Sequence, residues 1–137
     1  MNIFVKGVLF GVVAVLILDT VGSIMSKRYR FPYTKLSSIS FLLWATAGAF
    51  ASQGGTPDLI KSIGLGWIAG LLVGLIDSTL GWWISWQVGP GRLRPESTAC
   101  PKIARIVFRV TMLAAAVGAF GALIVGSLAK LIGHSGT

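Results

Sequence analysis

The chain has 137 residues, of which 54% are hydrophobic and only 12% are charged. A typical soluble domain is about 25% charged, and a domain this small leaves much of its surface exposed, so the composition excludes a soluble globular protein. It also excludes intrinsic disorder. The formal net charge of +8 lies in short segments between apolar runs, so we interpret it as a signal of membrane topology and expect no nucleic acid partner.

The residue types that build redox and metal sites are scarce. One cysteine, Cys100, and one histidine, His134, can form neither a disulfide framework nor a cluster of metal ligands. The sequence has no recognisable pair of nucleophile and histidine base and no glycine-rich nucleotide loop. We therefore predict no metal, no cofactor and no enzymatic activity.

Four apolar segments are candidates for membrane spans, because a helix needs about 20 mostly apolar residues to cross the bilayer core. In chain order they run over about residues 3–25, 36–52, 63–88 and 102–132. The second is the shortest, and no segment alternates with the period of two that a β-barrel requires. The sequence predicts an all-α integral membrane protein, with a single domain of four transmembrane helices over residues 1–137.

Lysine and arginine are concentrated around two of the connecting segments, and this bias sets membrane orientation. The residues concerned are Lys27, Arg28, Arg30, Lys35, Arg92, Arg94, Lys102, Arg105 and Arg109, against Lys6, Lys61 and Lys130 on the opposite side. Because cytoplasmic loops are enriched in these residues, we expect both basic segments in the cytoplasm and both termini outside it. The predicted location is a bacterial inner (plasma) membrane.

Three tryptophans lie where the third predicted helix reaches the cytoplasmic boundary. They are Trp82, Trp83 and Trp86. Indole side chains prefer the level of the lipid headgroups, so we expect these residues to anchor the helix in membrane lipid.

The first and third helices carry similar residues in a similar order, which indicates an internal repeat. Gly7 and Gly11 precede Asp19, Thr20 and Gly22, and Gly66 and Gly70 precede Asp77, Ser78 and Gly81. The second and fourth helices share the offsets of Lys35, Ile39 and Phe41 with those of Lys102, Ile106 and Phe108. Glycine-rich apolar helices can also resemble one another through composition alone. We predict two duplicated helical hairpins, arranged as parallel repeats about an axis along the membrane normal.

Small residues recur at intervals of four on several predicted helices, which favours close helix packing inside a membrane. The glycines concerned are Gly7, Gly11, Gly66, Gly70, Gly74, Gly118 and Gly126. They can pack the four helices of one chain, or they can form a subunit interface in a homo-oligomer. The sequence leaves both possibilities open.

Asp19 and Asp77 are the most informative residues of the sequence. An acidic side chain inside a membrane costs about 2.5–3.5 kcal/mol on insertion scales and normally faces protein or water. We expect both acids at a similar depth, about two turns inside the cytoplasmic boundary. If the repeat holds, they face each other near its axis, where two carboxylates cannot both ionise easily and could share a proton. Thr20 and Ser78 follow the acids directly and could add hydroxyl oxygens to a cation or proton path.

Arg109 provides a structural alternative for the same acids. It lies at the inner boundary of the fourth helix, one turn after Arg105. A salt bridge from Asp19 or Asp77 to Arg109 would lock two helices together and give the acids a structural role.

These residues support two hypotheses about function. The first is a small channel or transporter that works as a homo-oligomer, with Asp19 and Asp77 on a cation or proton path. The alternative is a non-catalytic accessory or assembly subunit of a larger membrane complex, with glycine faces for docking and the acids in salt bridges. Since Arg109 can neutralise only one acid directly, the sequence favours transport.

Overall fold

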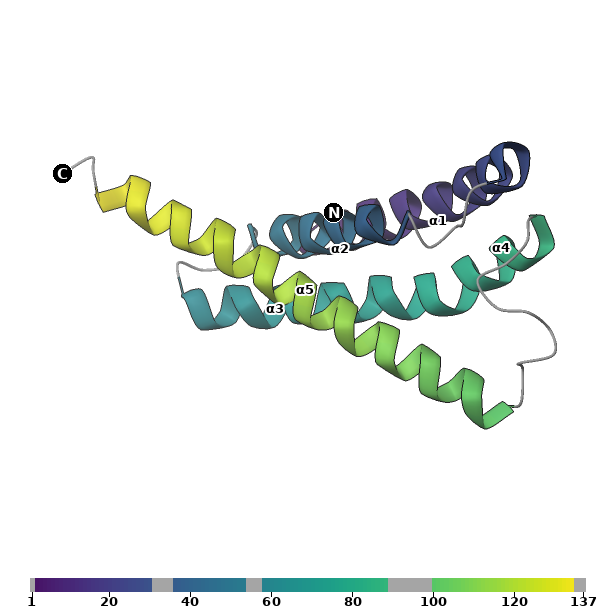
Figure 1. Ribbon diagram of the computed structural model, residues 1–137. Coiled ribbons are helices and arrows are strands. Elements are labelled where there is room, and N and C mark those ends of the chain that lie inside the picture. The colour runs from purple at the N-terminus through teal and green to yellow at the C-terminus, as the bar shows by residue number, and fades with distance from the viewer. Residues whose placement is uncertain (1, 31–35, 54–57, 89–99, 135–137) are drawn as a thin grey trace.

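The computed structural model describes residues 2–30, 36–53, 58–88 and 100–134, and these residues are helical, with no strand among them. The elements are α1 (Ile3–Tyr29), α2 (Ser37–Ser52), α3 (Leu59–Ile76), the π-helix η2 (Asp77–Gly81), α4 (Trp82–Val88) and α5 (Cys100–His134). Because α3, η2 and α4 follow one another without a break, they form one rod, as Figure 1 shows. The all-α fold and the four predicted helices are confirmed.

Three of these helices are long and apolar enough to cross a membrane. They run over Ile3–Tyr29, Leu59–Ile84 and Ile103–Ile132, whereas the apolar part of α2, Ser38–Ser52, is shorter. Large hydrophobic side chains cover the outside of the long helices; Ile17 is 57% exposed and Phe108 is 64% exposed. An outer surface this apolar is suited to contact with lipid or with another protein.

The four rods alternate in direction (Figure 1). α1 and α3–η2–α4 run one way, and α2 and α5 run the other way. The end where α1 and α4 finish and α2 and α5 start is called the basic end here, because Lys27, Arg28 and Arg105 lie near it. The opposite end, where α1 and α3 start, is called the far end and carries Lys6 and Lys61. The predicted Lys35, Arg92 and Arg94 lie outside the described residues.

The helices do not pack symmetrically. α2 and α3 contact each other, and α1 and α5 each contact both of them. In a symmetric repeat, α1 corresponds to α3 and α2 corresponds to α5, so the contact between α2 and α3 would have a counterpart between α5 and α1. Within the described residues, α1 and α5 are not closely packed. The internal repeat therefore stays a prediction from the sequence.

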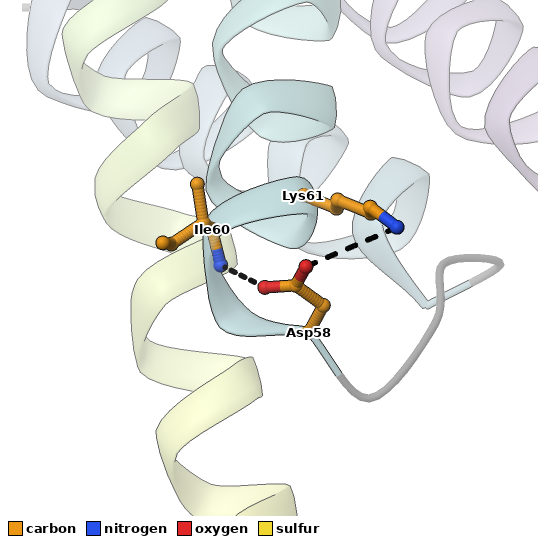
Figure 2. Close-up of polar contacts among 3 residues, drawn as sticks. All are labelled: Asp58, Ile60 and Lys61. Carbon is orange, nitrogen blue, oxygen red and sulfur yellow. Dashed lines mark hydrogen bonds and ion pairs between the residues drawn. The ribbon is translucent and has the colours of Figure 1, made fainter.

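The start of α3 differs from the prediction because of a capping residue. The helix begins at Leu59 rather than near Ile63, and Asp58 is its N-cap. The Asp58 carboxylate accepts a hydrogen bond from the Ile60 backbone N–H at 3.0 Å and forms an ion pair with Lys61 at 3.9 Å, as Figure 2 shows. An aspartate at this position satisfies a backbone donor that the first helical turn leaves unpaired, which adds one turn to the helix.

α1 extends beyond its predicted end, Met25, to Tyr29. Lys27 and Arg28 lie in its last turn, where positive charge interacts favourably with the helix dipole. Arg30 then adopts a left-handed conformation with φ of 54°, which stops the helix.

Glycines let the helix backbones approach one another within the chain. A Cβ built at Gly7 would meet the Ala51 backbone nitrogen at 2.6 Å, and one built at Gly118 would meet the Gly66 carbonyl oxygen at 2.5 Å. The other predicted packing glycines with a close neighbour on another helix are Gly11, Gly66, Gly70 and Gly74. Gly126 meets only the Leu59 side chain, at 2.8 Å. Close packing between small residues thus holds this bundle together internally.

Candidate functional site

The buried face of α1 changes in character along the helix. Its buried residues, in order from the far end, are Gly7, Gly11, Val15, Asp19, Gly22, Ser23 and Ser26. They recur at intervals of three and four, which places them on one face of the helix. The face is small and apolar up to Val15 and becomes polar from Asp19 toward the basic end.

Asp19 and Asp77 are both fully buried, and their carboxylates meet at Gly81. A Cβ built at Gly81 would overlap Asp19 Oδ2 and would lie 3.2 Å from Asp77 Oδ1. Two carboxylate oxygens from different helices therefore border the same point, and only a glycine leaves room for them. The structure thus brings together the two acids that the sequence pairs, with α1 packed against η2 and α4.

The π-helix η2 begins at Asp77, and the sequence analysis did not foresee it. The Trp82 backbone N–H donates to the Asp77 carbonyl oxygen, five residues earlier, which is the π-helical pattern. A π turn holds one more residue than an α turn. The spacing from Asp77 to Gly81 is indeed one residue longer than that from Asp19 to Gly22. Single π turns inside α-helices are frequently found at functional sites.

The two hydroxyl residues next to the acids have different surroundings. The Ser78 hydroxyl is buried and lies 3.2 Å from Thr111 Oγ1 on α5, and it donates to the Leu75 carbonyl oxygen at 3.2 Å. Thr20 donates to the Leu16 carbonyl oxygen at 2.8 Å and lines an apolar hollow on α1 with Leu16 and Ile17. Ser78 is thus part of the buried polar region, whereas Thr20 is turned toward the apolar hollow of α1.

Among the described residues, no ion pair joins Arg109 to either acid. Its side chain is exposed, and within the described part of the chain the ion pair between Lys61 and Asp58 is the one that forms. α5 packs on η2, where Thr111 lies 3.2 Å from Ser78, but it does not pack closely on the described parts of α1 or α4. The expected salt bridge between Arg109 and Asp19 or Asp77 therefore stays a prediction from the sequence.

The tryptophans predicted as interface anchors lie at the basic end of the third rod. Trp82 is half-buried, and Trp83 is 53% exposed on the outer surface. The side chain of Trp86 lies outside the described residues. The exposed indole of Trp83 is the one whose placement fits contact with lipid.

The sequence analysis missed two residues with buried polar atoms. Ser23 Oγ on α1 and Trp44 Nε1 on α2 are buried without a hydrogen-bond partner in the described part of the chain. Buried polar atoms of this kind are rare in folded proteins and call for an explanation. Serine at i+4 from a buried acid was the only signal in the sequence that could have pointed to Ser23.

We found no match to this chain among protein-family models, curated proteins or solved structures. Within the described residues there is also no group of three or more histidine, cysteine, aspartate or glutamate side chains placed to hold a metal ion.

Proposed function

We propose that this chain is a small integral membrane protein that binds and passes protons or small cations at the Asp19–Asp77 pair. The observation that carries the proposal is the meeting of two fully buried carboxylates at Gly81, inside a bundle with three helices able to cross a membrane. We further propose that it works as a homo-oligomer in a bacterial inner membrane.

The energetics of buried charge support this role. An acidic residue in a membrane span is costly to insert, and such residues commonly line ion paths or proton relays. Two ionised carboxylates that border one point repel each other strongly in a medium of low dielectric constant. A cation held at the pair would reduce that repulsion, and this is the role that we propose for the site.

The alternative, an accessory subunit of a larger complex, drew its support from a structural salt bridge. Arg109 was the expected partner, and its side chain is exposed instead. The glycine faces named for docking are occupied by other helices of the same chain. The use of the glycine faces within the chain supports transport over the accessory role.

The decisive experiment replaces each buried acid by its amide. Asp19→Asn and Asp77→Asn keep the side-chain volume and remove the charge, so we expect folded proteins whose proton or cation flux in liposomes falls to the level of protein-free vesicles. Asp58→Asn is the matched control, because asparagine caps a helix as well as aspartate does and this acid is exposed. Wild-type flux in both single variants would contradict the proposal.

The orientation is tested by cysteine labelling. Cys100 is the only cysteine, so Cys100→Ser provides a background without thiols. Tyr29→Cys at the basic end and Gln53→Cys at the far end replace exposed residues and preserve every charge. We expect an impermeant maleimide to label Gln53→Cys in intact bacteria and Tyr29→Cys only after the membrane is broken, because basic segments stay in the cytoplasm. The reverse pattern would show that the orientation is wrong.

A further inference from the structure

The surroundings of the acid pair differ between the two directions along the bundle. One turn toward the far end, Val15 precedes Asp19 and Val73 precedes Asp77, and both valines are almost completely buried. They form one hydrophobic cluster together with Trp44, Ala47 and Ala114. Gly11 extends this cluster, because a Cβ there would lie 2.6 Å from Ala47 Cβ and 2.8 Å from a Val73 methyl group. On this side the acids adjoin a closely packed apolar layer.

One turn toward the basic end, the equivalent positions are Ser23 and Gly81. Ser23 is 1% exposed, as Val15 is, so the two sides differ in polarity and not in burial. Ser26 follows on the same face of α1 and is 3% exposed. Small and hydroxyl-bearing residues therefore replace the valines on this side.

The Ser23 hydroxyl identifies what this side is built to hold. It has no hydrogen-bond partner in the described part of the chain, and an unpaired buried hydroxyl is usually explained by an ordered water molecule. In a helix the Cα–Cβ bond tilts toward the N-terminus, so the Ser23 side chain leans toward the turn that carries Asp19. The atom that lacks a partner therefore lies about one turn from Asp19 on the buried face of α1.

The register of α2 shows which elements lie beside this part of α1. Gly7 lies against Ala51 and Gly11 against Ala47, so the antiparallel helices place Asp19 at the level of the first turn of α2. Beyond that level, among the described elements, α1 packs on η2 and α4. Among the described elements, the neighbours of this polar part of α1 are therefore η2 and α4, whereas α2 lies beside its apolar part.

We propose that water enters the bundle from the basic end along Ser23 and Ser26 and reaches the Asp19–Asp77 pair, with one water molecule bound between Ser23 Oγ and Asp19. The valine layer closes the route from the far end. This water entry rests on the proposed function, which names what is transported. It adds the side of the bundle from which a proton or hydrated cation arrives. A serine hydroxyl and a water molecule can each donate and accept a hydrogen bond, which a proton relay requires.

Trp44 also has a buried polar atom without a hydrogen-bond partner in the described part of the chain, and it does not open a second route. Its indole N–H donates but cannot accept a hydrogen bond, so it cannot relay a proton. It also belongs to the hydrophobic cluster that contains both valines.

Silver ions test the entry, because they are small, travel in water and react with thiolates. In the Cys100→Ser background, Ser23→Cys and Val15→Cys place a thiol on the same face of α1 at the same burial, on opposite sides of Asp19. Silver added at the basic end is expected to consume the thiol of Ser23→Cys at least about tenfold faster than that of Val15→Cys, since only hydrated thiols ionise and react readily. The thiols that remain are counted by a maleimide mass shift after denaturation.

Three outcomes would overturn the entry: equal rates at the two positions, no reaction at Ser23→Cys, or faster reaction from the far end. Ser26→Cys carries the same test if Ser23→Cys does not fold. Labelling requires no transport, so the two proposals fail separately. Fast labelling in a protein without flux supports the entry and contradicts the proposed function. Slow labelling of Ser23→Cys in a protein whose flux depends on Asp19 would contradict the water entry but not the proposed function.

Discussion

Gly118→Ala is expected to lower the melting temperature by about 10 °C or to prevent folding, because the added methyl group has nowhere to go. Its Cβ would lie 2.5 Å from the Gly66 carbonyl oxygen and 2.9 Å from Gly70 Cα. These are backbone atoms of α3, so no side chain can rotate away and the two helices must separate. Overpacking of this kind costs about 1–3 kcal/mol or more.

Gly64→Ala is the matched control for this change. A Cβ at Gly64 meets nothing within 4 Å, and alanine is favoured over glycine by about 1 kcal/mol inside a helix. We expect its melting temperature to stay the same or to rise slightly. Thermal unfolding in detergent, followed by tryptophan fluorescence and size-exclusion chromatography, compares the two variants. Equal melting temperatures would show that the α3–α5 contact is not as close as described.

Gly81→Ala is expected to abolish flux with a much smaller loss of stability. The new methyl group would overlap Asp19 Oδ2, so the Asp19 carboxylate must turn away from its position beside Asp77. A side-chain carboxylate can move where a backbone cannot, and for this reason the fold survives. The Gly81→Ala substitution therefore changes the geometry of the acid pair while the helix bundle stays folded.

Liposome flux and thermal unfolding are measured on the same preparation of Gly81→Ala. Gly126→Ala serves as its control, because the Cβ there meets only the flexible end of the Leu59 side chain, at 2.8 Å. Wild-type flux in Gly81→Ala would mean that the position of the Asp19 carboxylate does not matter for transport. A drop in melting temperature as large as that of Gly118→Ala would mean that η2 cannot adapt.

Hydropathy was sufficient to predict the helices, because each apolar run is long compared with the segments between them. The helix ends differ from the predicted ones where a capping residue sets them, as Asp58 does before α3 and Arg30 does after α1. The π-helix could not be predicted, since one additional residue between Asp77 and Gly81 leaves the hydropathy of the rod unchanged. It could be recognised only by comparison with the spacing from Asp19 to Gly22.

The acid pair was accessible to sequence reasoning because a charged residue in an apolar helix stands out. Ser23 was not, because a serine in such a helix carries no signal until the buried face is known. Arg109 was assigned to the acids by its sequence position alone. The structure leaves it exposed because the direction of α5 relative to α1 and α4 depends on tertiary packing, which the sequence does not reveal.

In the membrane location that we propose, the shortness of α2 would have a consequence for the surrounding bilayer. With 16 residues it is about 24 Å long, whereas a typical hydrocarbon core is about 30 Å thick. A membrane adapts to such a hydrophobic mismatch by becoming thinner beside the short helix, at a cost of a fraction of a kcal/mol for each ångström. The thinning would draw the headgroup layer inward along one side of the bundle. Acyl-chain length would then act on the protein in its proposed location, and membranes of short-chain lipids would accommodate it at the lowest elastic cost.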